Sequence, residues 1–268
     1  MSRPPAEPAA ARALFVSPHL DDVALSCGGL VCHSAAAAER PRIVTLFTLG
    51  PGPGDELTPL ARRLHEAWSA GAERSPDELW QERRAEDAAA AAVLGAERSW
   101  LPFQDALYRG PHYSSERELF GAVNAGEQSL VERLAGELIA LWRTTARAAV
   151  YLPLAVGWHV DHQIACGLAE PLRRAGAEVI HYEDFPYAAR PGALEARLEQ
   201  LPPLTPRIVD VSPHLPRRLE AIAKYASQLP LIFGDIGPWE ETTRRFAAAR
   251  AGGSGTHAER VWEAASGG

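Results

Sequence analysis

Short apolar runs alternate with longer segments of helical periodicity along most of the chain. Buried strands are predicted where an apolar run is short and bounded by turn residues, at 13–16, 42–49, 98–101, 148–152, 178–182 and 208–211. Apolar side chains at helical spacing predict helices at about 22–38, 79–94, 129–143, 162–175 and 215–227. This order is typical of a mostly parallel sheet with right-handed crossovers. We therefore predict an α/β fold in which helices flank the sheet.

The pattern predicts one domain with a short tail at each end. Residues 1–11 are rich in proline and alanine and predict a disordered tail, residues 12–263 a single domain, and residues 264–268 a frayed end. Residues 51–76 are rich in glycine, proline and charge, which predicts a long surface loop with some helix. The last apolar run, 258–262, fits either a final strand or a docked tail.

Composition excludes several classes of partner. The chain has 268 residues, of which 46% are hydrophobic and 23% charged, as in soluble globular domains. A net charge of −7 without any long basic run argues against nucleic acid or an anionic membrane as a partner. Three cysteines without a CxxC pair favour a reducing setting. Since neither a signal peptide nor a run of about 20 apolar residues is visible, we predict a cytoplasmic protein.

Two polar motifs directly follow predicted strands and open the next helix. They are residues 17–22 (SPHLDD) and residues 157–162 (GWHVDH). Parallel strands point their carboxyl ends to one edge of the sheet, so we expect the two loops to meet there. Each motif holds two candidate metal ligands spaced three residues apart, namely His19 with Asp22 and His159 with His162. Two histidines and one carboxylate suffice for a catalytic zinc, which leaves other side chains for proton transfer.

Both motifs resemble those of a known enzyme family. SPHLDD is similar to the PHPDD motif, and HVDH to the HPDH motif, of the LmbE-like (PIG-L) family of zinc-dependent N-acetylglucosaminyl de-N-acetylases. The resemblance runs in order from about Phe15 to Tyr225. It implies a single Rossmann-like domain, a Zn²⁺ cofactor and hydrolysis of an N-acetyl or other N-acyl group on an amino sugar. The family also contains amidases and deacetylases of antibiotic sugars.

The resemblance implies a role for each motif residue. Three zinc ligands are implied, which are His19, Asp22 and His162. Asp21 would be the general base, and a protonated His159 would stabilise the oxyanion. Asp161 would orient His159 and tune its charge. Outside this context, the Asp21-Asp22 pair would be interpreted as an ordinary helix cap.

Two weaker matches suggest substrate contacts. Arg83 matches a substrate-binding arginine on a helix that ends in Leu-Gly, and Asp105 stands where the family places a carboxylate that binds sugar hydroxyls. The alternative for Arg83 is an exposed helix salt bridge with Glu86 or Asp87, which would contribute only tenths of a kcal/mol. Both alternatives for Arg83 stay open on the sequence alone.

The chain also departs from the family pattern. Leu20 replaces the usual proline, which we expect to change only loop stiffness. Gly157 stands where some relatives carry an active-site tyrosine, and the candidate substitutes are Tyr108, Tyr113 and Tyr187. The aromatic residues within 182–187 fit either a pocket wall or turn packing, and His181 ends a strand that could border the site.

We predict an N-deacetylase acting on an amino-sugar-containing small molecule. Residues 26–29 (SCGG) are more similar to the natural-product members of the family than to its thiol-pathway members. Three alternatives remain: an amidase of a mycothiol-type thiol conjugate, a non-catalytic carbohydrate-binding protein and a two-metal phosphoesterase. The presence of both Asp21 and His159 argues against the binding protein, and a ligand set for one metal only argues against the phosphoesterase.

Overall fold

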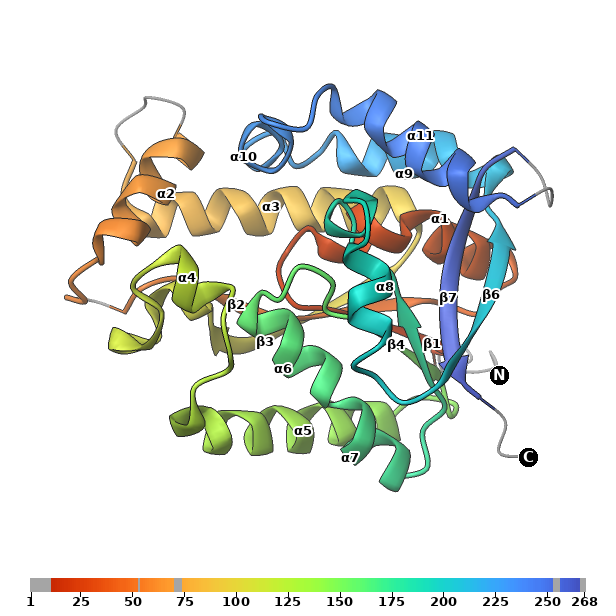
Figure 1. Cartoon of the computed structure of the whole chain (residues 1–268), viewed down its shortest axis with the longest axis horizontal. Helices are drawn as coiled ribbons and strands as arrows, with labels where there is room; N and C mark the ends of the chain where they lie inside the picture. Colours follow the sequence, from red (N-terminus) through yellow and green to blue (C-terminus); the bar gives the residue numbers. More distant parts are fainter. Residues whose placement is uncertain (1–10, 53, 70–73, 253–255, 266–268) are drawn as a thin grey trace, which may run out of the picture.

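A seven-stranded sheet forms the centre of the protein in the computed structural model, which describes residues 11–52, 54–69, 74–252 and 256–265 (Figure 1). The strands are β1 (Ala13–Ser17), β2 (Arg42–Leu49), β3 (Glu97–Gln104), β4 (Ala149–Pro153), β5 (Val179–Tyr182), β6 (Leu204–Asp210) and β7 (Ala258–Ala264). Their order is β3-β2-β1-β4-β5-β7-β6. The first five strands in this order pair in parallel, and β7 is antiparallel to both β5 and β6. The predicted α/β class with a mostly parallel sheet is confirmed.

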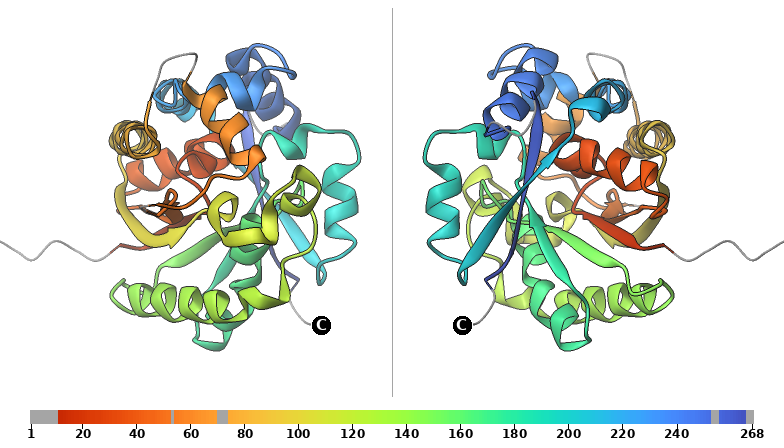
Figure 2. Two further views of the ribbon diagram at one scale, coloured as in Figure 1. Left: turned by 90° about the vertical axis from the view of Figure 1, so that its left-hand side faces the viewer. Right: turned by 90° about the vertical axis from the view of Figure 1, so that its right-hand side faces the viewer.

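Helices cover both faces of the sheet (Figures 1 and 2). One face carries α1 (Asp22–Ala36), α3 (Pro76–Leu94), α9 (Leu215–Ile222) and α11 (Trp239–Arg250), and the other carries α5 (Gln128–Arg143), α6 (Val160–Gly167) and α7 (Ala169–Arg174). Successive residues of β1 point to opposite faces, so Leu14 packs in the core under α5–α7 and Phe15 in the core under α1 and α3. Burial of both faces explains why this strand is a continuous apolar run.

The strand order places both sequence motifs at one point of the sheet. β1 and β4 are neighbours, with Phe15 beside Tyr151, although about 130 residues separate them in the chain. From β1 the chain continues to β2 and β3 on one side, and from β4 to β5 on the other. This reversal creates a crevice beyond the carboxyl ends of the two strands, which is where open α/β sheets bind ligands.

Several predicted boundaries differ from the structure. The helix predicted at 162–175 is two helices, α6 and α7, because Pro171 has no N–H to donate and its ring disfavours a continuous helix. The helix predicted at 215–227 ends at Ile222, and the last apolar run is a strand, β7. The loop at 51–76 contains α2 (Pro59–Ser69), as expected of a loop with some helix. Residues 1–10 and 266–268, where tails are predicted, lie outside the described residues.

Four short helices complete the described fold or border its cavity. They are α2, α4 (Glu116–Leu119), α8 (Ala193–Leu198) and α10 (Leu229–Phe233). The sequence pattern did not predict α8, α10 or α11, because the first two are too short to show helical periodicity and the third is polar over most of its surface. None of the described helices is both long and apolar enough to cross a membrane.

A break in α1 fixes the turn that follows β1. Cys27 has a non-helical backbone (φ −142°, ψ 27°), which interrupts the hydrogen-bond ladder. Glu259 of β7 accepts the freed N–H of Gly29 at 2.8 Å, while Arg218 of α9 donates to the carbonyl of Leu25. The break leaves a helix C-terminus at Leu25 and a new helix N-terminus at Gly29. The guanidinium lies at the C-terminus and the carboxylate at the N-terminus, so both charges complement the helix dipoles. The first turn of α1, which carries the motif carboxylates, is thereby anchored to the rest of the fold.

Candidate active site

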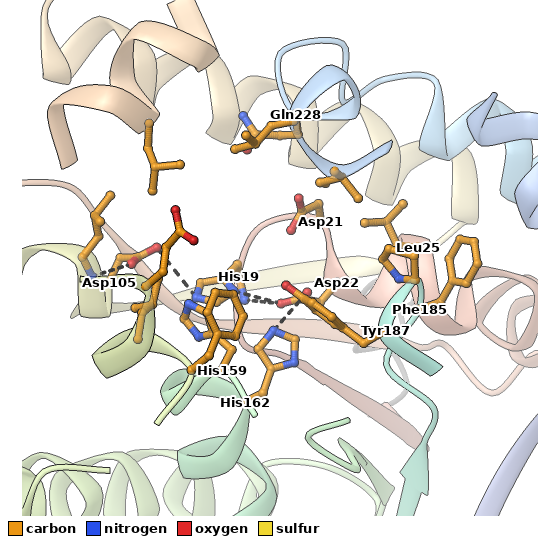
Figure 3. A pocket seen from close by; sticks show the side chains of 18 of the residues that line it. His19, Asp21, Asp22, Leu25, Asp105, His159, His162, Phe185, Tyr187 and Gln228 are labelled. Atoms are coloured by element: carbon orange, nitrogen blue, oxygen red, sulfur yellow. Dashed lines mark hydrogen bonds and ion pairs between the residues drawn. The ribbon is translucent and has the colours of Figure 1, made fainter. Parts of the chain in front are cut away.

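A cavity of about 320 Å³ opens beyond the carboxyl ends of β1 and β4 (Figure 3). The side chains of both motifs meet at its inner end. Its polar lining includes His19, Asp21, Asp22, Asp105, His159 and His162. These side chains are buried, except that of His19, which is partly buried. Water therefore has little access to screen the charges among them. The structure therefore brings together the side chains that the sequence motifs single out.

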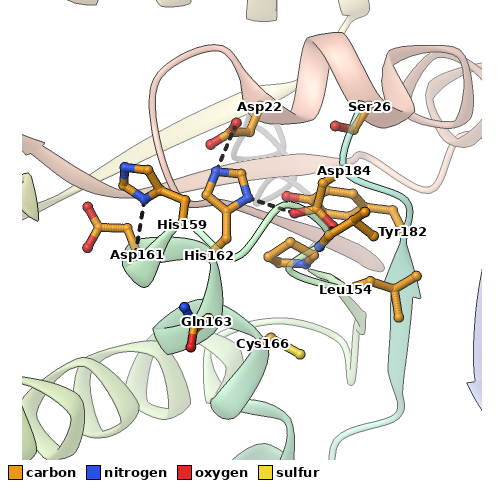
Figure 4. Close-up of polar contacts among 12 residues, drawn as sticks. Asp22, Ser26, Leu154, His159, Asp161, His162, Gln163, Cys166, Tyr182 and Asp184 are labelled. Carbon is orange, nitrogen blue, oxygen red and sulfur yellow. Dashed lines mark hydrogen bonds and ion pairs between the residues drawn. The ribbon is translucent and has the colours of Figure 1, made fainter. Parts of the chain in front are cut away.

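Asp22 lies between the two histidines that come from different motifs. Its Oδ2 is 3.2 Å from His19 Nδ1, and its Oδ1 is 3.3 Å from His162 Nε2 (Figures 3 and 4). Asp22 Oδ2 also accepts the backbone N–H of His19 at 2.7 Å, which fixes the turn between them. One carboxylate thus faces one nitrogen of each histidine ring.

Each of these histidines is held from behind by a second carboxylate. His162 Nδ1 is 2.6 Å from Asp184 Oδ1, and His19 Nε2 is 3.1 Å from Asp161 Oδ2. Asp184 is itself fixed by the N–H of Val156 at 3.0 Å. A carboxylate on the far nitrogen is the arrangement that orients metal-binding histidines in proteins.

The donor set fits a tetrahedral divalent metal ion. Ligand atoms about 2.0–2.2 Å from a zinc ion lie about 3.3–3.5 Å from one another when the geometry is tetrahedral. The separations of 3.2 Å from Asp22 Oδ2 to His19 and 3.3 Å from Asp22 Oδ1 to His162 are close to that value, although they involve different oxygens of the carboxylate. One carboxylate with two imidazoles is also a donor set that zinc accepts. The cluster can therefore hold a metal ion.

Among the described residues, the groups of three whose ligand atoms all lie within 4.8 Å of one another do not include Asp22. His19, His159 and His162 present ligand atoms within 4.8 Å of one another, as do His19, Asp105 and Asp161. His159 accepts the N–H of Asp161 at its Nδ1 (3.2 Å), so its hydrogen resides on Nε2 and that nitrogen is a donor, not a ligand. Asp161 is ion-paired with Arg109 at 2.6 Å. Asp22 with His19 and His162 is a third possible ligand set.

Protonation in the metal-free cluster reflects its negative surroundings. Although burial opposes the charged form, Asp22 and Asp184 raise the pKa of His162 to about 10, and the nearby carboxylates hold that of His19 well above its ordinary value. Burial also opposes ionisation of Asp22, but the histidines hold its pKa well below the ordinary value. A site that stabilises two imidazolium ions in this way also favours a divalent cation.

Asp21 is free to act as a base. It occupies the N-cap position of α1, yet its side chain makes no capping hydrogen bond, so the ordinary cap interpretation does not hold for this residue. Its carboxyl group lines the cavity (Figure 3). Burial and the charge of Asp22 raise its pKa to about 6, against the opposing influence of Arg83 and His19. This value suits proton exchange near neutral pH.

Asp161 and His159 are placed differently from what the resemblance implies. The carboxylate of Asp161 contacts His19, Arg109 and the N–H of Ala106, whereas only its backbone N–H reaches the ring of His159. Burial and the charge of His19 hold the pKa of His159 well below its ordinary value. Asp161 opposes this shift, so its charge still acts on His159, but in the metal-free cluster the neutral ring is favoured over the protonated one that the resemblance implies.

Arg83 is a buried cation that lines the cavity. Its guanidinium carbon lies 4.6 Å from the ring centroids of both Trp68 and Trp80, so the group contacts two indole rings. Its side chain is buried, and Nε and Nη1 have no hydrogen-bond partner within the described residues. The alternative of an exposed helix salt bridge is therefore wrong, since Glu86 and Asp87 bind other residues.

Asp105 has one oxygen committed to the fold. Its Oδ1 accepts the N–H of Leu107 at 2.9 Å and caps a short 3₁₀ turn. Its Oδ2 is 3.7 Å from His19 Nε2, and the residue lines the cavity. One oxygen of this carboxylate thus remains at the cavity side.

Tyr187 occupies the space beside Gly157. A Cβ atom at Gly157 (φ +94°) would lie 2.6 Å from the Tyr187 ring, so this position has no room for a side chain. Tyr187 lines the cavity, with its ring centroid 6.1 Å from that of His162. By contrast, the hydroxyl of Tyr108 binds His65 and that of Tyr113 binds the N–H of Asn124. Of the three candidate tyrosines, Tyr187 is the one beside the group formed by His19, Asp22 and His162, which we call the metal cluster.

His181, Tyr182 and two of the cysteines lie outside the cavity lining. His181 is buried and its Nδ1 is 3.3 Å from the carbonyl of Pro153, so it belongs to the sheet. Cys27 and Cys166 are buried free thiols. Within residues 182–187, Phe185 and Tyr187 line the cavity, while Tyr182 binds the carbonyl of Val16.

Sequence reasoning missed two residues that hold the cluster. Asp184 follows β5 just as the motifs follow β1 and β4, so its position after a third parallel strand was a usable signal. Arg109 lies in a loop after β3 and shows no pattern, because its role depends on a contact with Asp161 that only the fold creates.

Comparison with known proteins agrees with this geometry. The family model described as GlcNAc-PI de-N-acetylase matches residues 14–171. A 2'-N-acetylparomamine deacetylase of Streptomyces fradiae is 35% identical over 223 residues, covering 81% of this chain and 73% of that protein. A protein of the same name from Niallia circulans is 27% identical, covering 83% of this chain and 82% of that protein.

A solved structure extends the likeness to the fold. The zinc-inhibited form of a teicoplanin deacetylase superposes with a TM-score of 0.79 at 26% identity, covering 94% of this chain and 97% of that one. The family model covers more than half of the chain, and the relative from Streptomyces fradiae exceeds 30% identity across most of both proteins. The chain belongs to the PIG-L (GlcNAc-PI de-N-acetylase) family and is an N-deacetylase, as the two sequence motifs predict.

Proposed function

We propose that the protein uses one zinc ion, held by His19, Asp22 and His162, to remove the N-acetyl group from an amino sugar in a natural product. The observation that carries this proposal is Asp22, which faces one nitrogen of each histidine at 3.2 and 3.3 Å inside a cavity. The names of the relatives, deacetylases of acetylparomamine and of teicoplanin, support an amino-sugar substrate in antibiotic biosynthesis.

The chain's own residues supply proton transfer. A bound zinc ion would lower the pKa of its water to about 7 and polarise the amide carbonyl. Asp21, with a pKa of about 6, accepts the proton of the attacking water and returns it to the departing amine nitrogen. Without this return, the amine would leave as a strongly basic anion. Asp21 is therefore both general base and general acid.

His159 stabilises the oxygen of the amide as its negative charge develops. Since Nδ1 accepts the N–H of Asp161, the hydrogen on Nε2 is available to that oxygen. A neutral donor of this kind needs no proton from solution, and a donor of an oxyanion site contributes about 10²–10³ in rate. We propose this neutral form in place of the protonated one.

Three further residues contact the substrate in this proposal. Arg83, which lines the cavity as a cation, contacts substrate oxygens, and Asp105 accepts hydrogen bonds from sugar hydroxyls at the oxygen that faces His19. Tyr187 takes the place of the tyrosine that is missing at position 157, with its hydroxyl near the carboxylates of Asp21 and Asp22. The proximity of these charges, together with burial, raises the pKa of Tyr187 and keeps it protonated.

A cytoplasmic location is also proposed. All three cysteines are buried free thiols, which suits a reducing compartment.

The test combines metal analysis with an amine-release assay. We expect one zinc per chain and fluorescamine-reactive amine from N-acetylglucosamine derivatives. Sugar binding without amine release would instead indicate a carbohydrate-binding protein. Preferential cleavage of a mycothiol-type conjugate would indicate the amidase.

A further inference from the structure

The outer part of the cavity has an apolar lining that the proposed chemistry does not use. Six side chains, which we call the outer wall, come from α2, from the end of α4 and from α10: Leu60, Leu64, Leu119, Phe120, Leu231 and Ile232. None of these elements carries a motif residue. The outer wall is therefore a separate surface that faces the same space as the metal cluster.

Two members of the outer wall are unusually exposed. Phe120 is 39% exposed and Leu231 is 44% exposed, and both are among the five large hydrophobic side chains exposed in the described part of the chain. Large apolar side chains that face a cavity, rather than scattered solvent, mark surfaces that a ligand covers. Phe120 also stacks edge-on against His159, with ring centroids 5.4 Å apart, so the outer wall reaches the catalytic end of the cavity.

The outer wall offers no polar side chain to a polycationic ligand. The one carboxylate that α4 contributes to the lining, Glu116, pairs with Arg63 at 3.0 Å. Two lining cations, Arg83 and Arg190, form no ion pair with a carboxylate in the described structure. The ammonium groups of an aminocyclitol would therefore find no acceptor on the outer wall itself, whereas an apolar group would pack on it.

We propose that the amino sugar carries an aryl or alkyl group at its glycosidic oxygen and that this group packs on the outer wall. This inference rests on the proposed deacetylase function. It assigns the metal cluster to the reaction and the outer wall to the choice of substrate. The N-acyl group itself lies at the polar inner end, so the apolar surface is not needed for a longer acyl chain.

The experiment compares glycosides that share the same acetylated amino sugar. Acetate release is measured for methyl, hexyl and phenyl N-acetylglucosaminides and for an N-acetylated aminoglycoside. We expect kcat/KM to be about 10-fold higher for the hexyl and phenyl glycosides than for the methyl glycoside, mainly through KM. Equal values for methyl and hexyl, or the highest value for the aminoglycoside, would overturn the proposal. So would a preference that follows the N-acyl chain length instead.

Variants tie the preference to the outer wall. Leu231→Ala and Ile232→Ala should each remove most of the hexyl preference while leaving the rate on the methyl glycoside nearly unchanged. Ile208→Ala is the matched control, because Ile208 is 43% exposed but lies on β6 and outside the cavity lining. A preference that survives both outer-wall variants would contradict the assignment.

A binding measurement separates this inference from the proposed function. Calorimetry with the deacetylated methyl and hexyl glucosaminides reports affinity without turnover. Tighter binding of the hexyl product that Leu231→Ala abolishes supports the outer wall even if no substrate releases acetate. Equal affinity for both products overturns it even if the enzyme is active.

Discussion

The two ends of the cavity are built in contrasting ways. The inner end comes from turns that follow paired strands, and its carboxylates and imidazoles are fixed by one another, as in the chain from Asp22 through His162 to Asp184. The outer end comes from short helices in connecting segments, and its side chains are apolar, with Phe120 and Leu231 exposed. Rigid strand ends thus hold the chemistry, while peripheral helices offer a surface that can change without disturbing it.

This contrast explains how relatives can share a reaction and differ in substrate. A change at the inner end alters charges that are buried together, so its effect spreads through the cluster. A change on the outer wall removes apolar contact and little else. Substitutions at the two ends should therefore differ in size and in the kinetic constant they affect.

The largest expected effect is at Asp21. Asp21→Asn should lower kcat by about 10³-fold, because the amide cannot accept the water proton, while zinc content stays at one per chain. Zinc analysis and steady-state kinetics check this. Asp77→Asn, an exposed carboxylate in the first turn of α3, is the control and should leave kcat unchanged. An Asp21→Asn protein with most of its activity would refute the assigned base.

Zinc binding should depend steeply on pH. In the metal-free protein, the neighbouring carboxylates hold the pKa of His162 at about 10 and that of His19 well above its ordinary value, so both rings are protonated at pH 7. Both protons must leave when the nitrogens bind the metal. Apparent affinity should therefore rise by about 10²-fold for each pH unit between 6 and 8.

Calorimetry in buffers with different ionisation enthalpies measures this proton release. We expect about two protons released for each zinc bound at pH 7. Release of none would show that the two histidines are neutral before the metal binds.

Asp184 offers an intermediate effect. Asp184→Asn removes the charge behind His162 but keeps the shape, so zinc affinity should fall by about 10–100-fold. At saturating zinc, kcat should remain close to that of the parent protein. A competition assay with a chelator measures the affinity, and an unchanged value would show that Asp184 does not orient the ligand.

The smallest effect is expected from the outer wall. Leu231→Ala should leave zinc content and kcat on a methyl glycoside within about 2-fold of the parent values, because the side chain touches neither the metal cluster nor the amide. Zinc analysis and steady-state kinetics on that glycoside check both values. A large loss of kcat would mean that the two ends of the cavity are not independent.

The contrast also separates what the sequence could predict from what it could not. The inner end was predictable because His19 and Asp22, like His159 and His162, are near in sequence and follow recognisable strands. Their meeting followed from the rule that parallel strands share a carboxyl edge. The α/β alternation was predictable for the same reason, since long strands and helices show their period.

The surroundings of Arg83 and the outer wall were not predictable from the sequence. Arg83 contacts Trp68 and Trp80, and whether it pairs with Glu86 or enters a cavity depends on how α2 packs against α3. The outer wall depends on α4 and α10, which are too short to show periodicity. Tertiary packing determines both features, and local sequence carries no signal for it.

The position of the bound metal tests the assignment most directly. Anomalous diffraction at the zinc edge should give a single peak within about 2.2 Å of His19 Nδ1, a carboxylate oxygen of Asp22 and His162 Nε2, with Asp21 nearby but unbound. A peak coordinated by His159, or by Asp105 with Asp161, would contradict the ligand set. So would the absence of zinc from a fully active crystal.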